Sequence, residues 1–186
     1  MSGVRPRYVV LDRDGTLVRH VLYLKSPAGV QLLPTVRDGL SALQRAGCVL
    51  FLHTNQSGAG RGFFTMRDAH ACNAEMISQI GLGEDLFEQI CIAPETPDDD
   101  PVYRKPSGRF GREIMHTYRA GPEQVCYIGD SPSDLLTAKH LGCMGVGVNT
   151  GLEDLSAAVR ADDTLRDCPV FATFSEAASF VLGATH

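Results

Sequence analysis

The sequence predicts an α/β fold in which a doubly wound parallel sheet carries helices on both faces. Two observations favour this fold. Short apolar runs alternate along the chain with segments of helical periodicity, and each run is apolar throughout rather than alternating with polar residues. Such strands are typical of parallel sheets, because the crossover helices bury both faces. With 186 residues, 44 % of them hydrophobic, the chain can bury one core, and residues 1–186 are interpreted as a single domain.

The expected elements follow one another in regular order. The first apolar run spans residues 8–11, and a Gly- and Pro-punctuated stretch reaching Pro34 is expected to cover its end as a flap. Further strands are expected at 48–54, 88–93, 124–130, 143–148 and, most weakly, 169–174. Helices are expected at 35–47, 65–81, 107–121, 131–142 and 175–183.

Capping motifs support the start of two of these helices. Thr35 with Asp38, and Thr65 with Asp68, have the Ser/Thr-x-x-acid spacing of a capping box. Gly47 follows the first of these helices as a stop signal.

Composition and charge narrow the function classes. No apolar run approaches the ~18–20 residues of a membrane span, and residues 1–8 lack the apolar core of a signal peptide, so a cytoplasmic protein is expected. The formal charge of −5, without a Lys/Arg-rich run, argues against a nucleic-acid partner. A small metabolite is the expected partner, and the chain is expected to act as a monomer. The cysteines show no CxxC pair and are interpreted as buried, reduced thiols: Cys48, Cys72, Cys91, Cys126, Cys143 and Cys168.

Unusual polar residues follow three of the expected strands. Asp12 and Asp14 come after the first strand, residues 54–57 (Thr-Asn-Gln-Ser) after the second, and Asp130 after the fourth. Ligands of open parallel sheets bind beyond the carboxyl ends of the strands, near the point where strand order reverses. We therefore expect these three groups to converge on one rim of the sheet.

Neighbouring carboxylates at a strand end are best explained by a divalent cation that neutralises their charge. The candidate metal ligands are Asp12, Asp14 and Asp130, together with a backbone carbonyl. Hard oxygen ligands of this kind suit Mg²⁺.

The same rim provides the parts for phosphoryl transfer. Asp12 would attack phosphorus and form an aspartyl-phosphate, and Asp14 would protonate the leaving oxygen and later accept a proton from the attacking water. Thr54 and nearby backbone N–H groups could hold the phosphoryl oxygens. Lys105, in "YRKPSG", would balance the charge of the pentavalent state.

These motifs together resemble the haloacid dehalogenase superfamily of phosphotransferases. The resemblance rests on DxDGT, a strand-end Thr, a Lys before the third crossover helix and GDxxxD, in that order over about 170 residues. It implies a doubly wound, Rossmann-like fold, Mg²⁺ dependence and the roles given above to Asp12, Asp14, Thr54, Lys105 and Asp130. The family's transport ATPases carry Thr at the second acidic position, so Asp14 favours a hydrolysing phosphatase.

A narrower resemblance points to the branch that holds heptose-1,7-bisphosphate phosphatase and histidinol-phosphate phosphatase. It rests on "DRDGT", "YLKSPAGVQLLPTV", "TNQSGAGRGFF" and "RKPSG", and it implies the absence of a large cap domain. The substrate pocket implied by this resemblance contains Asn55, Gln56, Ser57, Arg61, Arg104 and Lys105. The favoured substrate is a sugar phosphate such as D-glycero-D-manno-heptose 1,7-bisphosphate. Histidinol phosphate, a polynucleotide 3′-phosphate, and a non-catalytic binding role are the alternatives.

The chain departs from this branch at one loop. Relatives carry a zinc loop of the form CxH…CxCRKP, whereas this chain reads "CIAPETPDDDPVYRKP". Only Cys91 is retained, and Ala93, Pro101 and Tyr103 stand at the other three positions. One thiolate cannot form a tetrahedral zinc site, so structural zinc is expected to be absent.

Several polar residues have two readings. In "SPSD", Asp134 can cap a helix together with Ser131, or it can support the metal. Arg61 and Arg104 can contact substrate or be solvated surface charges. His53, on an apolar strand, is expected to be packed rather than catalytic, and residues 98–100 (Asp-Asp-Asp) to be solvated.

Overall fold

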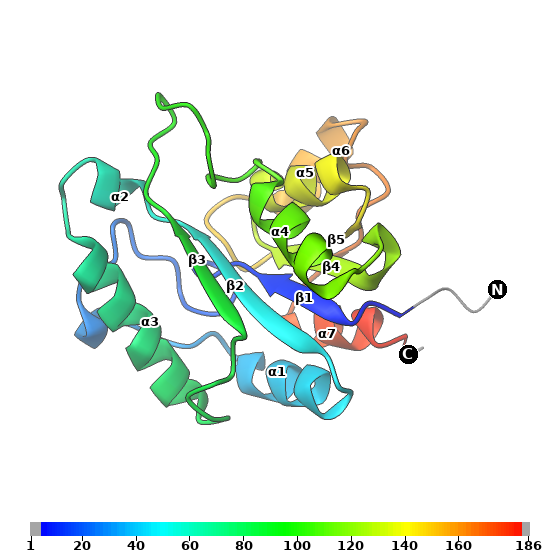
Figure 1. Cartoon of the computed structure of the whole chain (residues 1–186), viewed down its shortest axis with the longest axis horizontal. Coiled ribbons are helices and arrows are strands. Elements are labelled where there is room, and N and C mark those ends of the chain that lie inside the picture. The colour runs from blue at the N-terminus through cyan, green and yellow to red at the C-terminus, as the bar shows by residue number, and fades with distance from the viewer. Residues whose placement is uncertain (1–4, 184–186) are drawn as a thin grey trace.

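The computed structural model describes residues 5–183 and contains a six-stranded, all-parallel sheet (Figure 1). Residues 1–4 and 184–186 lie outside this range. They include the start of the segment considered as a signal peptide and both ends of the expected domain. The strand order is β3-β2-β1-β4-β5-β6. The strands are β1 (Tyr8–Leu11), β2 (Val49–Asn55), β3 (Gln89–Ala93), β4 (Val125–Gly129), β5 (Met144–Val148) and β6 (Val170–Phe171).

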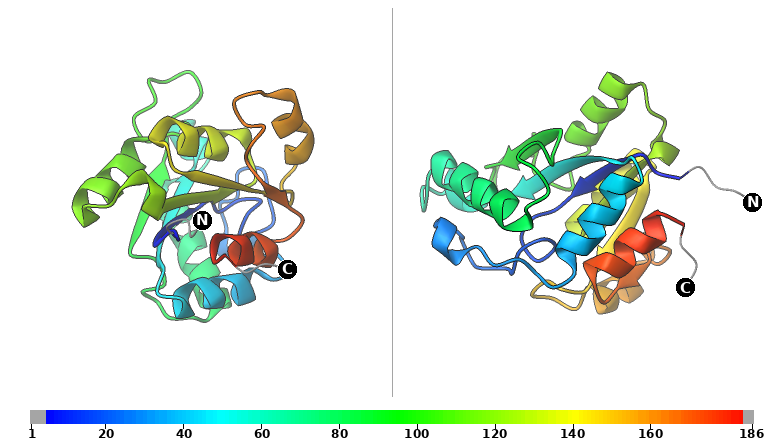
Figure 2. Two further views of the ribbon diagram at one scale, coloured as in Figure 1. Left: turned by 90° about the vertical axis from the view of Figure 1, so that its right-hand side faces the viewer. Right: turned by 90° about the horizontal axis from the view of Figure 1, so that it is seen from below.

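Helices cover both faces of this sheet, as Figures 1 and 2 show. The helices are α1 (Val36–Arg45), α2 (Ser57–Gly60), α3 (Met66–Ile80), α4 (Arg109–Tyr118), α5 (Pro132–Leu141), α6 (Leu155–Ala161) and α7 (Phe174–Val181), with 3₁₀ turns η1 (Pro27–Gly29) and η2 (Pro122–Gln124). One core joins α1, α3 and α7 to the sheet, and a second joins α4 and α5 to the opposite face. Within residues 5–183, the segments between these helices and strands are loops and short turns, and none of them forms a separate cap domain.

The alternation of side chains along β1 explains the two cores. Val9 and Leu11 pack with α1 and α3, whereas Tyr8 and Val10 pack with α4. All four side chains are buried, because successive residues of a strand point to opposite, helix-covered faces. The predicted doubly wound sheet is therefore confirmed. Among residues 5–183, no helix is long and apolar enough to cross a membrane.

Two local predictions at helix starts have different outcomes. The box of Thr65 and Asp68 is confirmed, since the Asp68 carboxylate accepts the Thr65 N–H at 2.7 Å and the Thr65 hydroxyl accepts the Asp68 N–H at 3.2 Å. The box predicted for Thr35 and Asp38 is wrong. Thr35 has a left-handed backbone with φ of 67°, and its hydroxyl accepts the N–H of Ser175 near the start of α7.

The C-terminal third departs most from the expected boundaries. The strand expected at 169–174 shortens to β6, because Thr173 caps α7 and accepts the Glu176 N–H. Helix α6 was not predicted: its seven residues give a short apolar pattern, and Asp154 caps it by accepting the N–H of Ala157.

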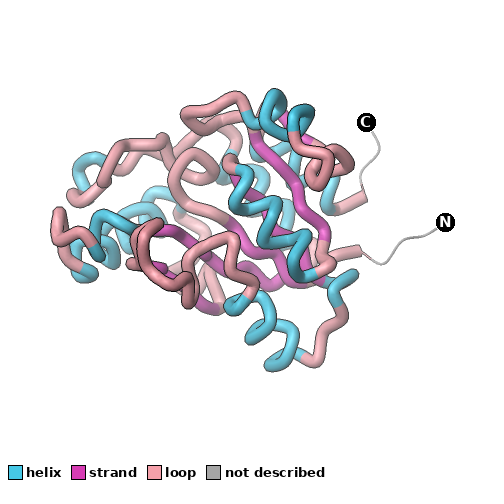
Figure 3. Tube along the Cα trace, turned by 90° about the horizontal axis from the view of Figure 1, so that it is seen from above, coloured by secondary structure: helices cyan, strands magenta, loops and turns pink. Residues whose placement is uncertain are grey.

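The sheet geometry fixes where a ligand can bind. From β1 the strand order runs outward to β2 and β3 on one side and to β4, β5 and β6 on the other, so the order reverses between β1 and β4. Figure 3 shows the long loops gathered at the end of the sheet away from the two termini. In open parallel sheets, ligands bind beyond the carboxyl ends of the strands, at the point where the strand order reverses.

Candidate active site

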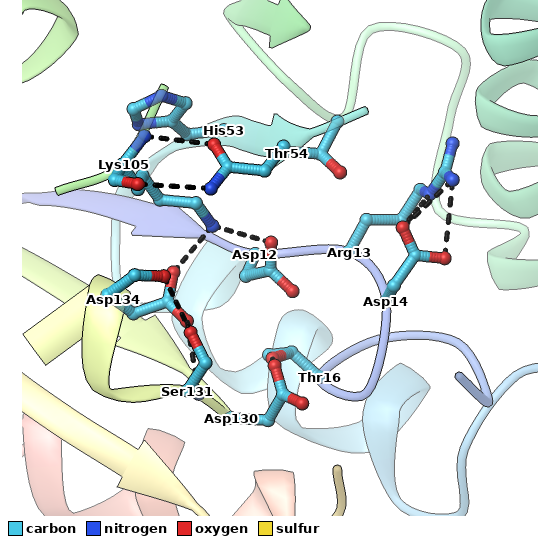
Figure 4. A network of polar contacts seen from close by, with 12 residues as sticks. Asp12, Arg13, Asp14, Thr16, His53, Thr54, Lys105, Asp130, Ser131 and Asp134 are labelled. Atoms are coloured by element: carbon cyan, nitrogen blue, oxygen red, sulfur yellow. Dashed lines mark hydrogen bonds and ion pairs between the residues drawn. The ribbon is translucent and has the colours of Figure 1, made fainter. Parts of the chain in front are cut away.

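Three carboxylates meet at the reversal point (Figure 4). Asp12 extends β1, its N–H donating to the carbonyl of Ile128 in β4 at 3.0 Å. Asp130 follows β4 directly, and Asp134 lies in the first turn of α5. One carboxylate oxygen from each of these three aspartates lies within 4.8 Å of the others. The predicted convergence of Asp12 and Asp130 is thus seen in the structure, and Asp134 joins them.

Lys105 enters this cluster from the loop between β3 and α4. Its buried ammonium donates to Asp12 Oδ1 at 2.6 Å and to Asp134 Oδ1 at 2.5 Å (Figure 4). Burial alone would lower the pKa of Lys105, but the carboxylates of Asp12 and Asp134 outweigh burial and raise it. The Asn55 side chain holds the Lys105 backbone, accepting its N–H at 2.9 Å and donating to its carbonyl at 3.2 Å. Lys105 is therefore a fixed cation.

The remaining negative charge in the cluster is not balanced by protein groups. Burial, together with the neighbouring carboxylates of Asp134 and Asp14, raises the pKa of Asp12 to about 7 despite Lys105. Burial and the carboxylates of Asp12 and Asp134 raise the pKa of Asp130 to about 9. Crowded carboxylates with only oxygen donors fit a hard cation such as Mg²⁺.

Two glycines make room for the Asp130 carboxylate. A Cβ at Gly15, where φ is 84°, would lie 2.1 Å from Asp130 Oδ2, and a Cβ at Gly151 would lie 2.0 Å from the same atom. Any side chain at either position would displace the carboxylate. The Thr16 hydroxyl donates to the other oxygen of Asp130 at 3.4 Å. The cradle therefore fixes Asp130 beside Asp12.

Asp134 caps the start of α5, one of the two roles considered for it, and also pairs with Lys105. Its Oδ2 accepts the backbone N–H of Ser131 at 3.2 Å and the Ser131 hydroxyl at 2.9 Å. Its Oδ1 accepts from Lys105. One carboxylate thus caps α5 and also positions the cation of the site.

Asp14 lies apart from the three clustered carboxylates. Its Oδ1 and Oδ2 accept from Nη2 and Nε of Arg13, at 3.2 and 3.1 Å (Figure 4). Oδ2 also accepts from Gln56 at 2.7 Å. Gln56 donates to the Thr54 hydroxyl as well, at 2.8 Å, and Thr54 is completely buried. Both oxygens of Asp14 accept from side-chain donors, whereas Asp12 and Asp130 each accept from a side chain at Oδ1.

Two adjoining cavities open over these groups. A cavity of about 140 Å³ is lined by Asp12, Asp14, His20, Asn55, Lys105, Asp130, Ser131 and Ser133. A second, of about 200 Å³, is lined by Asp14, residues 20–24 of the flap, residues 55–58 and Phe64. Asp14, His20 and Asn55 line both. The cavities therefore meet at these three residues.

The arginines expected in the substrate pocket lie elsewhere. Neither Arg61 nor Arg104 lines either cavity. Arg61 lies 4.0 Å from an Asp98 carboxylate oxygen, and Arg104 donates to the carbonyl of Glu95 at 3.1 Å. Ser57 and Gln56, by contrast, line the larger cavity as expected.

Residues 94–107, here called the Lys loop, contain Pro101 and Tyr103, which stand at two cysteine positions of the CxH…CxCRKP pattern. Tyr103 is its main anchor: its N–H donates to Glu95 at 2.6 Å and its hydroxyl donates to Glu113 at 3.0 Å. Its carbonyl is hydrogen-bonded to His53 Nε2 at 2.9 Å, and the Arg109 guanidinium lies 4.8 Å from its ring centre. The residue at a relative's ligand position thus joins the loop to the sheet and to α4.

His53 is packed, as predicted. Its side chain is fully buried, and burial followed by the charge of Lys105 lowers its pKa to about 3. Residues 98–100 are exposed, also as predicted. The described cysteines are free: Cys48, Cys72, Cys126 and Cys168 are buried, and Cys91 and Cys143 are half-buried.

Sequence reasoning missed two residues of the site, Arg13 and His20. Arg13 alternates with Asp12 and Asp14 along the chain, which by itself suggests only that it points away from them. His20 lies in the flap, where no periodicity indicates its direction. The spacing of charges gave no signal for either residue, because the positions of both side chains depend on how the flap and α3 pack against the sheet.

Comparison with known proteins places this site in a family. A model described as haloacid dehalogenase-like hydrolase matches residues 21–142. A D-glycero-beta-D-manno-heptose-1,7-bisphosphate 7-phosphatase of Pseudomonas putida is 31 % identical over 146 residues, covering 78 % of this chain and 83 % of that protein. The corresponding enzyme of Bordetella bronchiseptica is 32 % identical, with coverages of 78 % and 82 %.

The folds agree as well. The crystal structure of a D,D-heptose 1,7-bisphosphate phosphatase from B. bronchiseptica, complexed with magnesium and phosphate, superposes with a TM-score of 0.85. The two sequences are 27 % identical in that comparison, which covers 96 % of this chain and 99 % of the other. Together with the family match and the carboxylate cluster at the sheet reversal, these findings show that the chain belongs to the haloacid dehalogenase-like hydrolases and is a phosphatase of that family.

Proposed function

We propose that the chain is a Mg²⁺-dependent phosphatase that hydrolyses a small sugar phosphate, such as D-glycero-D-manno-heptose 1,7-bisphosphate, through an aspartyl-phosphate on Asp12. The observation that carries the proposal is the buried Lys105 ammonium, 2.6 Å from Asp12 in the 140 Å³ cavity. The named activity of the P. putida and B. bronchiseptica relatives supports the choice of substrate.

The chemistry divides between the two aspartates of "DRDGT". A carboxylate oxygen of Asp12 attacks phosphorus while the bond from phosphorus to the leaving oxygen breaks, and Asp14 gives that oxygen a proton. Water then attacks phosphorus of the aspartyl-phosphate and passes its proton to Asp14. This step releases phosphate and restores Asp12.

Other groups stabilise the charge that develops. Lys105 is a fixed cation beside Asp12 and balances the charge on the transferring oxygens. The Thr54 hydroxyl accepts from Gln56, and its own O–H would donate to a phosphoryl oxygen. Asp12 and Asp130 would hold Mg²⁺, which when bound supplies positive charge between the carboxylates and the phosphoryl group.

The specificity residues proposed are those around the larger cavity, where the leaving group would lie. Asn55, Gln56 and Ser57 offer polar contacts. Arg61 and Arg104 would have to turn from Asp98 and Glu95 to meet a second phosphate. A bisphosphate therefore tests the proposal more strictly than a monophosphate does.

The test is a screen of phosphorylated metabolites with phosphate release measured with and without Mg²⁺. It includes heptose 1,7-bisphosphate, histidinol phosphate, a 3′-phosphorylated oligonucleotide and 4-nitrophenyl phosphate. Heptose 1,7-bisphosphate should give the highest kcat/KM, and activity should vanish with EDTA and return with Mg²⁺. Preference for another substrate would overturn the proposed substrate.

The proposed nucleophile has its own test. Asp12→Asn is close in shape to the native side chain, but its amide cannot attack phosphorus, so turnover should be lost while the far-UV spectrum stays unchanged. Substantial turnover by a preparation free of contaminating phosphatase would contradict the assignment of Asp12.

A further inference from the structure

Arg13 carries a buried charge directed away from the carboxylate cluster. Its side chain is 1 % exposed. Two of its nitrogens donate to Asp14, and the third, Nη1, donates to Asn73 Oδ1 of α3 at 2.8 Å. Removing a guanidinium from water is costly unless its donors are paired, so these partners hold it in one position. The fork of Arg13 thus links α3 to the Asp14 carboxylate.

Asn73 is committed to this contact. It is 2 % exposed, and its Nδ2 has no hydrogen-bond partner among residues 5–183. The neighbouring helix residues Cys72 and Met76 are completely buried in the core that joins α3 to the sheet. A polar side chain in that core would be better replaced by an apolar one unless its acceptor oxygen is needed. Within residues 5–183, the hydrogen bond from Arg13 is the only one that the Asn73 side chain makes.

Arg13 holds Asp14 in the wall that the two cavities share, which His20 and Asn55 also line. If the phosphoryl group occupies the smaller cavity beside Asp12 and the leaving group the larger, the bond that breaks crosses this wall. Its oxygen then lies beside the Asp14 carboxylate. General acid catalysis requires the donor within hydrogen-bond reach of that oxygen.

We propose that Arg13 and Asn73 are positioning residues, which hold Asp14 where it can protonate the leaving oxygen. The inference rests on the proposed function, because it requires Asp14 to be the general acid. Arg13 and Asn73 act through Asp14 and touch no substrate. Gln56, 2.7 Å from the same carboxylate, holds it from the other side.

This role has a signature that loss of stability does not imitate. When an alkyl phosphate is cleaved, the leaving alkoxide needs a proton from Asp14 as the bond to phosphorus breaks. A 4-nitrophenolate leaves without one. Since kcat/KM reports the steps up to loss of the leaving group, misplacing Asp14 should lower kcat/KM for the alkyl phosphate and spare 4-nitrophenyl phosphate.

The experiment compares variants by the ratio of these two kcat/KM values, using the fastest sugar phosphate of the screen as the alkyl substrate. Asp14→Asn should lower the ratio by about 100-fold or more. Asn73→Leu, which removes the acceptor at similar volume, should lower it by about 10-fold, and Arg13→Lys, which keeps the charge but loses the fork, by at least as much. Asn73→Asp, which keeps the acceptor oxygen, should restore the ratio to within about twofold of wild type.

Met76→Ala is the matched control, because it truncates a buried, apolar side chain of α3 about one turn from Asn73 and leaves the Asn73 acceptor in place. It should lower the melting temperature and leave the ratio unchanged. A normal ratio in Asn73→Leu, with an altered ratio in Asp14→Asn, would overturn the positioning role alone. An unchanged ratio in Asp14→Asn would overturn the general-acid assignment and the inference with it. If Asn73→Leu does not fold, Asn73→Ser and Arg13→Lys provide the same readout.

Discussion

The carboxylate cluster and the Lys loop are neighbours that are held in place by different means. In the cluster, the side chains of Asp12, Asp134 and Lys105 are all less than a tenth exposed, and the Lys105 ammonium pairs with both carboxylates. In the Lys loop, most residues are half-buried or exposed, and Tyr103 makes the contacts that join the loop to the sheet and to α4. The two regions meet at Lys105, which belongs to both.

Because of this difference, the residues that carry the chemistry are distinct from those that hold the loop in place. A buried ion pair tolerates no loss of a single partner, because the remaining charge stays buried without compensation. An exposed loop tolerates replacement of its anchor, provided that other contacts keep the same ends in place. The chain can therefore depart from the CxH…CxCRKP pattern in the loop while Lys105 still reaches Asp12. The predictions below test this separation.

The largest effect is expected at the point where the two regions meet. Lys105→Ala removes the cation that faces Asp12, so kcat should fall by about 100-fold or more on every substrate, including 4-nitrophenyl phosphate. Arg104→Ala is the matched control: it should mainly raise KM for the natural substrate and leave 4-nitrophenyl phosphate almost untouched. Steady-state kinetics on both substrates checks the pair. Equal losses in the two variants on both substrates would remove the division of roles between these adjacent cations.

A smaller effect is expected from the loop anchor. Tyr103→Ala removes the ring beside Arg109 and the hydroxyl that donates to Glu113, but keeps the backbone bonds. The melting temperature should fall by about 2–4 °C, and limited proteolysis should begin within residues 94–107. Tyr103→Phe, which loses only the hydroxyl, should lie between the variant and wild type. Unchanged proteolysis in Tyr103→Ala would show that other contacts hold the loop.

Much of the cluster, and less of its surroundings, could be predicted from the sequence. Asp12 and Asp130 follow apolar runs, and parallel strands bring such residues to one rim, so their meeting needed no knowledge of packing. The capping pattern at Asp134 could also be recognised in the sequence. The partners of Asp14 could not be predicted, because the contact from Arg13 to Asn73 depends on where α3 packs.

The same limit applies to local structure. The left-handed Thr35 is stabilised by a contact with Ser175, 140 residues away in the chain, which no local motif encodes. Asn55 was expected to bind substrate, and its carboxamide is paired with the Lys105 backbone, a contact that joins β2 to the Lys loop. Contacts between distant segments are the part that the pattern of residues does not reveal.

The pH dependence of stability tests the buried link between the sheet and the Lys loop. His53 has a pKa of about 3 in the folded protein, against 6.5 as its ordinary value. Between these values the unfolded chain binds a proton that the folded chain does not, so the folded state loses stability as the pH falls from 6.5 towards 3. The slope is at most about 1.4 kcal/mol per pH unit from this residue.

A variant isolates the contribution of His53 from that of the carboxylates. His53→Gln keeps a donor for the Tyr103 carbonyl but has no ring to titrate. Urea unfolding at pH 7, 6 and 5 should show wild type losing stability relative to His53→Gln as the pH falls, and a constant difference above pH 7. A difference that does not change between pH 7 and pH 5 would contradict the buried, neutral ring.

The smallest effect, none at all, is expected from removing zinc. Cys91, in β3, is the one ligand position of the CxH…CxCRKP pattern that keeps its cysteine. Burial and the nearby carboxylates of Glu95 and Glu113 raise the pKa of its thiol to about 12. A thiol that resists ionisation is a poor ligand on its own, since zinc binds the thiolate. Purified protein should therefore contain no stoichiometric zinc. A chelator that removes zinc and spares Mg²⁺ should leave the melting temperatures of wild type and Tyr103→Ala unchanged. If metal analysis found about one zinc per chain, or if the chelator lowered the melting temperature, a metal would hold the loop after all. The loop and the carboxylate cluster would then differ in which metal they bind.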